Sequence, residues 1–273
     1  MTASASAPAT TALAIFDIDG VVRDVGGSYR RALADTVEKF TDGAFRPTPE
    51  DIDALKSEGI WNNDWEASQE FIARHTEETG QPRNSITTTY EEIVTFFQSR
   101  YRGPDPEKLT GYICDEPLLL DRAYFESLSA GGIGWGFFSG ATRPSAEFVT
   151  GERIGLNNPV LVAMHDAPGK PDPTGLFDAI AQTGARLDLP KFDGLPAIYI
   201  GDTVADMQTI VKAIDERSGD RLWFAVGVLP PHVTGDRCEP YRENLRRAGA
   251  DLVLDRACQL DAAAIANLIV SRS

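Results

Sequence analysis

The sequence contains few of the residues that build disulfide frameworks or cysteine and histidine metal clusters. Only three cysteines and three histidines occur among the 273 residues, and the cysteines are widely spaced. An odd number of scattered cysteines fits neither a disulfide framework nor a zinc knuckle. Without a disulfide framework, the cysteines are expected to be reduced thiols, and the protein is expected in the cytoplasm. No apolar run approaches the roughly 20 residues that a membrane-spanning helix needs, so no membrane segment is expected.

Positive charge is also scarce. The chain has 26 Lys and Arg against 41 Asp and Glu, a formal net charge of −15. Nucleic acids and anionic membranes bind clustered positive charge, so this acidity argues against either partner. Residues 1–11 are rich in Ala, Ser and Thr and contain no Lys or Arg. They lack the positive start of a signal peptide and are expected to form a disordered tail.

Short apolar runs of three to six residues recur along the chain and are separated by helical patterns. The runs are 13–16, 133–138, 160–163, 197–200, 223–228 and 252–254. The helical patterns are 121–130, 144–152, 174–183, 204–215 and 241–248. Near-continuous apolar runs are typical of parallel strands buried on both faces. Strands that alternate with helices predict an α/β fold with a doubly wound parallel sheet.

Residues 24–115 break this alternation, because they carry helix signals and no convincing strand. The expected helix starts are Ser28, Thr48-Pro49, Asp64 and the Thr88-x-x-Glu91 capping box. A hydroxyl or carboxylate at such a position can accept a hydrogen bond from the first free backbone N–H groups. We therefore expect about four helices inserted after the first strand.

Carboxylates follow two of the predicted strands. Asp17 and Asp19 follow the first apolar run, and Asp202 and Asp206 follow the fourth. The carboxyl ends of parallel strands form the functional edge of such a sheet, and close carboxylates attract a cation. Two alternatives remain open: a turn with solvated aspartates at the first position, and a helix-capping pair Thr203-x-x-Asp206 at the second.

Two further elements lie at predicted strand ends. Ser139-Gly140 offers a hydroxyl beside accessible backbone N–H groups, and Lys170 lies in a proline-rich loop after the third strand. Each has a plain alternative, a strand-to-turn transition for the first and a solvated surface lysine for the second. Neither element alone indicates a function.

Taken together, Asp17-x-Asp19-Gly, Ser139, Lys170-Pro and Gly201-Asp202-x-x-x-Asp206 resemble the four ordered motifs of the haloacid dehalogenase superfamily. The resemblance covers residues 12–255. It implies a Rossmann-like core at 12–23 and 116–273 and an inserted helical cap domain at 24–115. It also implies a bound Mg²⁺ and phosphoryl transfer through an aspartyl-phosphate.

The resemblance also implies a role for each residue. Asp17 is the expected nucleophile, and Asp19 the expected general acid and base. The expected Mg²⁺ ligands are Asp17, the carbonyl of Asp19, Asp202 and, directly or through water, Asp206. Groups expected to hold the phosphoryl oxygens are Ser139, Lys170 and the backbone N–H groups of Ile18 and Gly140.

The motif details select a branch of the superfamily. Dehalogenases lack a carboxylate at the position of Asp19, so a dehalogenase is excluded. The gap from Asp19 to Ser139 is 120 positions and the gap from Ser139 to Lys170 is 31, so only the first can hold a cap domain. This matches a class IA, phosphoglycolate-phosphatase-like arrangement. Residues 24–31 and 59–65 also resemble an uncharacterised subfamily from cyanobacteria and archaea.

The expected substrate is a small phosphorylated metabolite, of the phosphoglycolate or sugar-phosphate class. Arg23, Arg30 and Arg143 could bind its leaving group, with surface ion pairing as the alternative. Trp61, Asn62, Asn63 and Trp65 could line the cap domain, with packing as the alternative. Two other functions stay open: a phosphomutase with the same chemistry, and a binding or regulatory protein without activity. The sequence does not indicate an oligomeric state.

Overall fold

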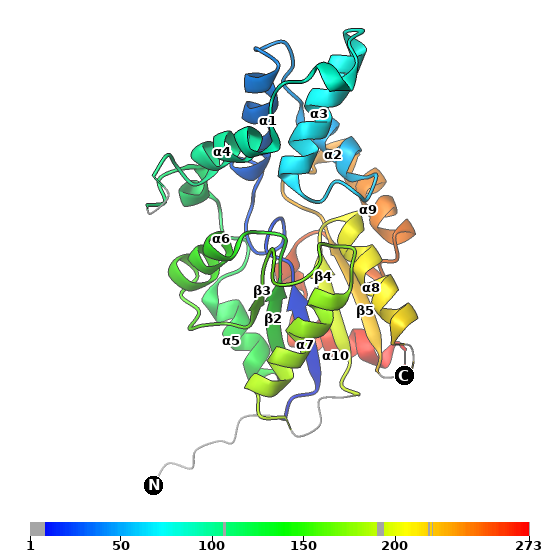
Figure 1. Ribbon diagram of the computed structural model, residues 1–273. Helices are drawn as coiled ribbons and strands as arrows, with labels where there is room; N and C mark the ends of the chain where they lie inside the picture. The colour runs from blue at the N-terminus through cyan, green and yellow to red at the C-terminus, as the bar shows by residue number, and fades with distance from the viewer. Residues whose placement is uncertain (1–8, 106–107, 190–193, 218, 220, 273) are drawn as a thin grey trace. The chain divides into compact units, whose positions relative to one another are not determined.

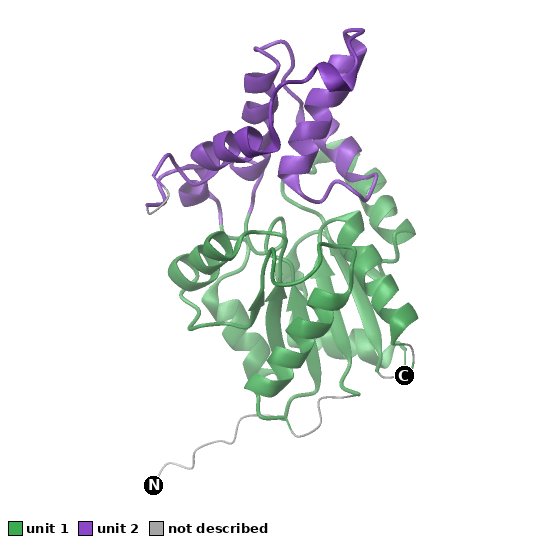
Figure 2. Ribbon diagram, in the orientation of Figure 1, with its two compact units in different colours: residues 1–23, 118–273 green, residues 24–117 purple. Residues whose placement is uncertain are grey.

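The computed structural model describes residues 9–105, 108–189, 194–217, 219 and 221–272. The chain divides into two compact units (Figure 2), unit 1 with residues 1–23 and 118–273 and unit 2 with residues 24–117. The inserted unit was expected to end at residue 115, two residues before the end of unit 2. Of the expected tail, residues 1–8 lie outside the described residues, and the N–H of Thr11 donates to the carbonyl of Gly132 at 2.8 Å. Within the described residues, no helix is both long and apolar enough to cross a membrane.

Unit 1 contains one six-stranded parallel sheet in the order β3-β2-β1-β4-β5-β6. The strands are β1 (Ala12–Phe16), β2 (Ile133–Phe138), β3 (Leu161–Val162), β4 (Ala197–Gly201), β5 (Trp223–Val228) and β6 (Leu252–Leu254). All six expected strands are present. β3 is shorter than expected because the side chain of Asp166 accepts the Ala163 N–H at 2.7 Å, which begins a turn there.

Helices cover both faces of this sheet (Figure 1), as expected for a doubly wound fold. Alternate residues of β1 point to opposite faces: Ala12, Ala14 and Phe16 to one, and Leu13 and Ile15 to the other. The first face packs against α5 (Arg122–Ala130), α6 (Arg143–Glu147) and α10 (Ala262–Val270). The second packs against α7 (Thr174–Arg186), α8 (Val204–Glu216) and α9 (Cys238–Arg247).

Some elements of unit 1 differ from the expected ones. The helix expected at 144–152 is α6 followed by a π-helix, Phe148–Arg153 (η3), in which the Thr150 hydroxyl bonds back to the Ala146 carbonyl. α9 begins three residues before its expected start, after the 3₁₀ turn η4 (Gly235–Arg237). α10, after the 3₁₀ turn η5 (Ala257–Gln259), was not predicted, although Asp261 caps it by accepting the Ala264 N–H at 2.7 Å.

All regular secondary structure in the described residues of unit 2 is helical, as expected. Its helices are α1 (Tyr29–Phe40), α2 (Pro49–Lys56), α3 (Asp64–Glu78) and α4 (Tyr90–Tyr101), with 3₁₀ turns η1 (Arg83–Ser85) and η2 (Tyr112–Asp115). α1 packs against α3 and α4. At the contact with α4, the Tyr29 ring lies 4.9 Å from the ring of Phe97 and 4.4 Å from that of Tyr101. These buried aromatic rings are part of the core of the unit.

The helix starts of unit 2 were predicted with mixed success. The Thr48 cap with Pro49 is confirmed. The capping box of α4 is Thr89 with Glu92, one residue later than expected. Asn63, not Asp64, caps α3. Ser28 occupies the N-cap position of α1, but its hydroxyl bonds to the carboxylate of Glu116 instead of capping the helix.

Candidate active site

The sheet brings the expected motifs to one edge. Asp17 directly follows β1, and Asp202 directly follows β4, the strand next to β1. Ser139 directly follows β2, and Lys170 lies in the loop after β3. From β1, the strand order continues through β2 and β3 on one side and through β4, β5 and β6 on the other. The carboxyl ends of β1 and β4 therefore lie at the topological switch point, where α/β proteins bind ligands.

Lys170 joins the first and last motifs. Its Nζ lies 2.8 Å from Asp17 Oδ1 and 2.7 Å from Asp206 Oδ1, and only 2% of its side chain is exposed. The ammonium also lies 5.1 Å from the ring centroid of Phe138 and 5.5 Å from that of Tyr199. Burial acts to lower the pKa of Lys170, but the two carboxylates outweigh it and raise that pKa. Lys170 is therefore a fixed cation of the site.

Asp206 is fully occupied by hydrogen bonds. Its Oδ1 accepts from Lys170 and from the Tyr199 hydroxyl at 2.9 Å. Its Oδ2 accepts from the Thr203 N–H at 2.9 Å and the Thr203 hydroxyl at 2.6 Å. Burial acts to raise the pKa of Asp206, but Lys170 and Thr203 outweigh it and lower that pKa. The capping alternative for Thr203 and Asp206 is thus real, and it coexists with the contact to Lys170.

Tyr199 is a site residue that the sequence analysis missed. It lies in the middle of β4 and is completely buried. A buried phenol needs a hydrogen-bond partner, and a tyrosine in an otherwise aliphatic strand two residues before Gly201 was the available signal. Tyr241 was missed as well: its hydroxyl donates to the Asp202 carbonyl at 2.9 Å and so fixes the loop after β4.

Asp17 and Asp202 have too little positive charge around them. Both are buried, and each has a carboxylate oxygen within 4.8 Å of the other's and of one from Asp206. Burial is the main cause that raises the pKa of Asp17 to about 7 against the attraction of Lys170, with Asp206 and Asp19 adding to the rise. Burial, then Asp206 and Asp17, raise the pKa of Asp202 well above its usual range.

These residues fit a divalent cation. Three carboxylates share one lysine, which leaves a formal deficit of two positive charges. Hard cations such as Mg²⁺ bind carboxylate oxygens of this kind. Gly20 leaves room for the Asp202 carboxylate, because a Cβ at residue 20 would lie 2.0 Å from Asp202 Oδ2. The φ of +74° at this residue also suits glycine. The donor set therefore fits Mg²⁺, which Asp17 and Asp202 would hold.

Asp19 is paired with Arg23. Asp19 Oδ1 lies 2.7 Å from Nε of Arg23 and 2.5 Å from its Nη2. The Asp19 side chain is 26% exposed, whereas that of Arg23 is completely buried. The structure thus places Arg23 against a predicted catalytic carboxylate.

The predicted phosphate-binding groups lie on the same edge. Ser139 is buried, its hydroxyl accepts the Ala141 N–H at 3.1 Å, and Gly140 is exposed. Ile18 is buried next to Asp17, and its carbonyl accepts N–H groups from the turn that follows. The loops after β1 and β2 therefore present backbone and hydroxyl groups beside the carboxylates.

The other predicted substrate residues are engaged within the protein. Arg143 is exposed and pairs with Glu147 at 3.1 Å and Asp166 at 2.5 Å. In unit 2, Arg30 is buried and pairs with Asp53 at 2.5 Å. The tryptophan and asparagine positions of unit 2 are likewise bonded or packed: Trp61 donates to Glu58, Asn63 caps α3, Trp65 is buried and Asn62 is half-buried.

A cavity of about 570 Å³ opens elsewhere in unit 1. Its lining includes Thr10, Gly132, Trp135 and Arg186, at the amino ends of β1 and β2. The buried carboxylates lie at the carboxyl ends of the strands. The acidic cluster, not this cavity, is therefore the candidate active site.

Comparisons with known proteins find relatives of this chain. A curated protein of Phytophthora nicotianae, described as imidazoleglycerol-phosphate dehydratase, is 30% identical over 196 residues, which are 71% of this chain and 39% of that protein. The chain thus spans about two fifths of that relative's length.

Solved structures share the fold at low sequence identity. Phosphatase Tt82 from Thermococcus thioreducens is 22% identical with a TM-score of 0.57, over 86% of this chain and 99% of that one. CbbY from Rhodobacter sphaeroides, solved with phosphate, is 17% identical with a TM-score of 0.55, over 92% and 96%. A family IA, variant 3 hydrolase from Entamoeba histolytica is 14% identical with a TM-score of 0.58, over 96% and 100%.

A sequence-family model described as haloacid dehalogenase-like hydrolase matches residues 11–213, which include all four motifs. The α/β fold and the superfamily expected from the sequence are confirmed. The chain belongs to the haloacid dehalogenase-like hydrolases.

Proposed function

We propose that the protein is a Mg²⁺-dependent phosphomonoesterase that hydrolyses a small phosphorylated metabolite through an aspartyl-phosphate. One observation carries this proposal: buried Asp17, Asp202 and Asp206 share a single lysine. A purely structural cluster of this kind would be unfavourable, because buried carboxylates without counter-charges are costly. Such a cluster is favoured at a site that binds a cation and a reacting group.

The first step transfers the phosphoryl group to Asp17. A carboxylate oxygen of Asp17 attacks phosphorus, a new P–O bond forms, and the bond to the leaving oxygen breaks. Asp19 gives its proton to that oxygen, so the product leaves as an alcohol. Lys170, the Ser139 hydroxyl and the N–H groups of Ile18 and Gly140 hold the phosphoryl oxygens as their charge changes.

The second step releases phosphate. Asp19, now ionised, takes a proton from water, and the water oxygen attacks phosphorus. The bond to Asp17 breaks and the carboxylate is restored. Because Asp19 acts as acid and then as base, its orientation matters in both steps.

Mg²⁺ would be held by Asp17, Asp202 and the carbonyl of Asp19, and when bound it supplies positive charge beside the phosphoryl oxygens. Asp206 acts indirectly in this proposal. Both of its oxygens already accept hydrogen bonds, so it holds Lys170 and the start of α8 in place.

Unit 2 is the proposed cap domain. A cap excludes bulk water and encloses small substrates, which favours a metabolite over a folded protein. The proposed substrate class is phosphoglycolate or a sugar phosphate. Arg30 and Arg143 are proposed contacts of its leaving group, which they can bind only after their present ion pairs break. The Phytophthora relative adds a second class, because the segment that matches this chain is part of a protein named for imidazoleglycerol phosphate.

Phosphate release from a panel of esters tests the proposal. The panel holds p-nitrophenyl phosphate, phosphoglycolate, several sugar phosphates and imidazoleglycerol phosphate. We expect hydrolysis that stops with EDTA and returns with added Mg²⁺. Activity that persists in EDTA would remove the metal from the proposal. Conversion of a sugar phosphate into an isomer with little free phosphate would favour the mutase, and binding without turnover would favour a regulatory protein.

A further inference from the structure

The loop after β1 places the buried guanidinium of Arg23 against the carboxylate of Asp19, the proposed acid and base. The Arg23 side chain is among the largest fully buried side chains of the described residues. The Asp19 side chain, by contrast, is 26% exposed. A buried arginine is held only where its N–H groups have acceptors, so this position is a specific one.

The backbone fixes this pair. The N–H groups of Val22 and Arg23 donate to the Ile18 carbonyl at 2.8 and 3.2 Å, and the Gly20 N–H donates to the Arg23 carbonyl at 2.9 Å. Residues 19 and 23 also form a bridge across this turn. The turn therefore brings the two side chains together before any substrate arrives.

A hydrogen bond and an ion-pair contact from Arg23 meet at one oxygen of Asp19. Nε and Nη2 both approach Asp19 Oδ1, at 2.7 and 2.5 Å. Within the part of the chain that the structure describes, no hydrogen bond or ion pair to Asp19 Oδ2 is found. One carboxylate oxygen of Asp19 is thus anchored by Arg23, and the other is not.

We infer that Arg23 is a positioning residue that orients Asp19 for proton transfer, and that it does not bind the substrate. The inference rests on the proposed phosphatase function. Arginine keeps its protons at all relevant pH values, so it can hold a carboxylate without competing as a proton donor. With Oδ1 anchored, Oδ2 is the atom that gives its proton to the leaving oxygen and later takes one from water.

The test compares leaving groups in Arg23→Met and Arg23→Lys. A phenyl ester needs protonation of its leaving oxygen more than a p-nitrophenyl ester, whose leaving group is stable as an anion. We expect Arg23→Met to lower kcat/KM about 100-fold for phenyl phosphate and less than about 10-fold for p-nitrophenyl phosphate, since general acid catalysis contributes about 10²–10⁴-fold. Arg23→Lys, which keeps the charge, should show a smaller difference of the same kind.

A double-mutant cycle separates positioning from structure. In an Asp19→Asn background, Arg23→Met should change kcat/KM for phenyl phosphate less than about threefold, because the group it orients is gone. The control is Arg122→Met, which breaks an exposed pair with Glu126 at the same four-residue spacing and should leave both esters unaffected.

Three outcomes would overturn the inference. They are equal losses for both esters, an undiminished loss in the Asp19→Asn background, and a rise in KM confined to carboxylate-bearing substrates. If Arg23→Met fails to fold by circular dichroism, the same comparison is decided with Arg23→Lys. A folded wild-type protein that hydrolyses no ester with Mg²⁺ would instead overturn the proposed function, and the inference with it.

Discussion

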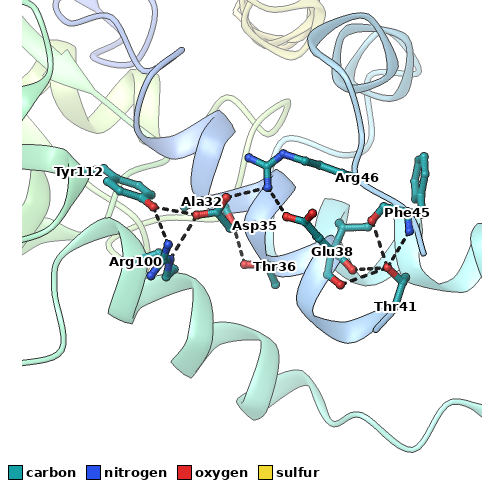
Figure 3. Close-up of polar contacts among 10 residues, drawn as sticks. Ala32, Asp35, Thr36, Glu38, Thr41, Phe45, Arg46, Arg100 and Tyr112 are labelled. Carbon is teal, nitrogen blue, oxygen red and sulfur yellow. Dashed lines mark hydrogen bonds and ion pairs between the residues drawn. The ribbon is translucent and has the colours of Figure 1, made fainter. Parts of the chain in front are cut away.

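The two units differ in what surrounds their buried and half-buried acidic side chains. In unit 2, Glu70 is buried and accepts hydrogen bonds from Arg74 at 2.7 Å and from Arg83 at 2.8 and 3.0 Å. Asp35 accepts from Arg46 and the Tyr112 hydroxyl, both at 2.8 Å, and pairs with Arg100 at 3.2 Å (Figure 3). Each of these carboxylates has two arginines beside it, although those arginines also pair with the more exposed Glu58, Glu77 and Glu38.

The pKa values differ accordingly. Arg83 is the main cause that lowers the pKa of Glu70. Burial acts to raise the pKa of Asp35, but its three donors outweigh it and lower that pKa. In unit 1, burial and then the neighbouring carboxylates raise the pKa of Asp17 and Asp202, and the attraction of the one lysine beside them does not outweigh this. The comparison teaches that local charge balance, not the number of acids, distinguishes a site from a structural network.

Replacing the nucleophile should have the largest effect. Asp17→Asn keeps the shape of the side chain but removes the attacking oxygen's charge, so we expect kcat to fall on the order of 10⁴-fold or more. The measurement is phosphate release from p-nitrophenyl phosphate with Mg²⁺, with circular dichroism to show that the fold persists. Mg²⁺-dependent turnover close to that of the wild type would contradict the role of Asp17.

Replacing Lys170 should lower the free energy of unfolding more than replacing one arginine of the Glu70 network in unit 2. Lys170→Met leaves three buried carboxylates without their cation, and loss of one partner of a buried ion pair costs about 3–5 kcal/mol. Chemical denaturation without divalent cation measures this loss. Arg74→Met in unit 2 is the matched control, since Glu70 keeps Arg83 as a partner. Equal losses for the two variants would contradict the charge-balance argument.

Sequence patterns predicted the strands and the edge of the sheet at which the four motifs lie. A near-continuous apolar run such as Ile133–Phe138 has few structures open to it other than a buried strand, and polar residues at its carboxyl end must lie at the sheet edge. The spacing of the motifs along the chain then indicated which strand each followed. These features are local, so the sequence alone contains them.

Two kinds of feature were not predictable from the sequence: the choice between two equivalent capping patterns, and contacts between residues far apart in the chain. The Thr88-Thr89 and Glu91-Glu92 pairs satisfy the capping pattern in two registers, and the second is the one that forms. Ser28 would cap α1, but Glu116, 88 positions away, binds its hydroxyl. The burial of Arg23 depends on the turn after β1 and on the residues packed around it, which no spacing rule reveals.

Without a divalent cation, the stability of unit 1 should depend on pH in an unusual direction. The pKa of Asp17 is about 7 in the folded protein, above its usual value, so the folded state binds more protons than the unfolded state between about pH 4 and pH 7. Its contribution to the free energy of unfolding is therefore present at low pH and lost as the pH rises through 7. The midpoint of thermal unfolding in EDTA, followed from pH 5.5 to 8, measures this.

Mg²⁺ should reverse that loss. Cations bind the ionised carboxylates, so a Mg²⁺ concentration about 100-fold above its dissociation constant should add about 2.7 kcal/mol at pH 8 and less at pH 5.5. Asp202→Ala, which lacks a proposed ligand, should lose most of this effect. A Mg²⁺ effect of the same size at both pH values would contradict the assignment of the raised pKa values to the metal site.

The smallest effect is expected where an acid of unit 2 is neutralised by several donors. Asp35→Asn weakens its bonds to Arg46 and Arg100, but both arginines are nearly half exposed, so the loss should be about 1 kcal/mol. The pKa of Asp35 lies below its usual value, so its contribution is present at neutral pH and is lost as the pH falls below about 4.

The difference in unfolding free energy between wild type and Asp35→Asn should therefore shrink on acidification, in the opposite direction to the change expected for Asp17. Glu126→Gln, in an exposed pair of unit 1, is the control and should cost at most about 0.5 kcal/mol. The Mg²⁺-dependent stabilisation should be unchanged in Asp35→Asn, because its carboxylate already has its donors and no part in the metal site. A reduced Mg²⁺ effect in this variant would show that the two acidic networks are coupled.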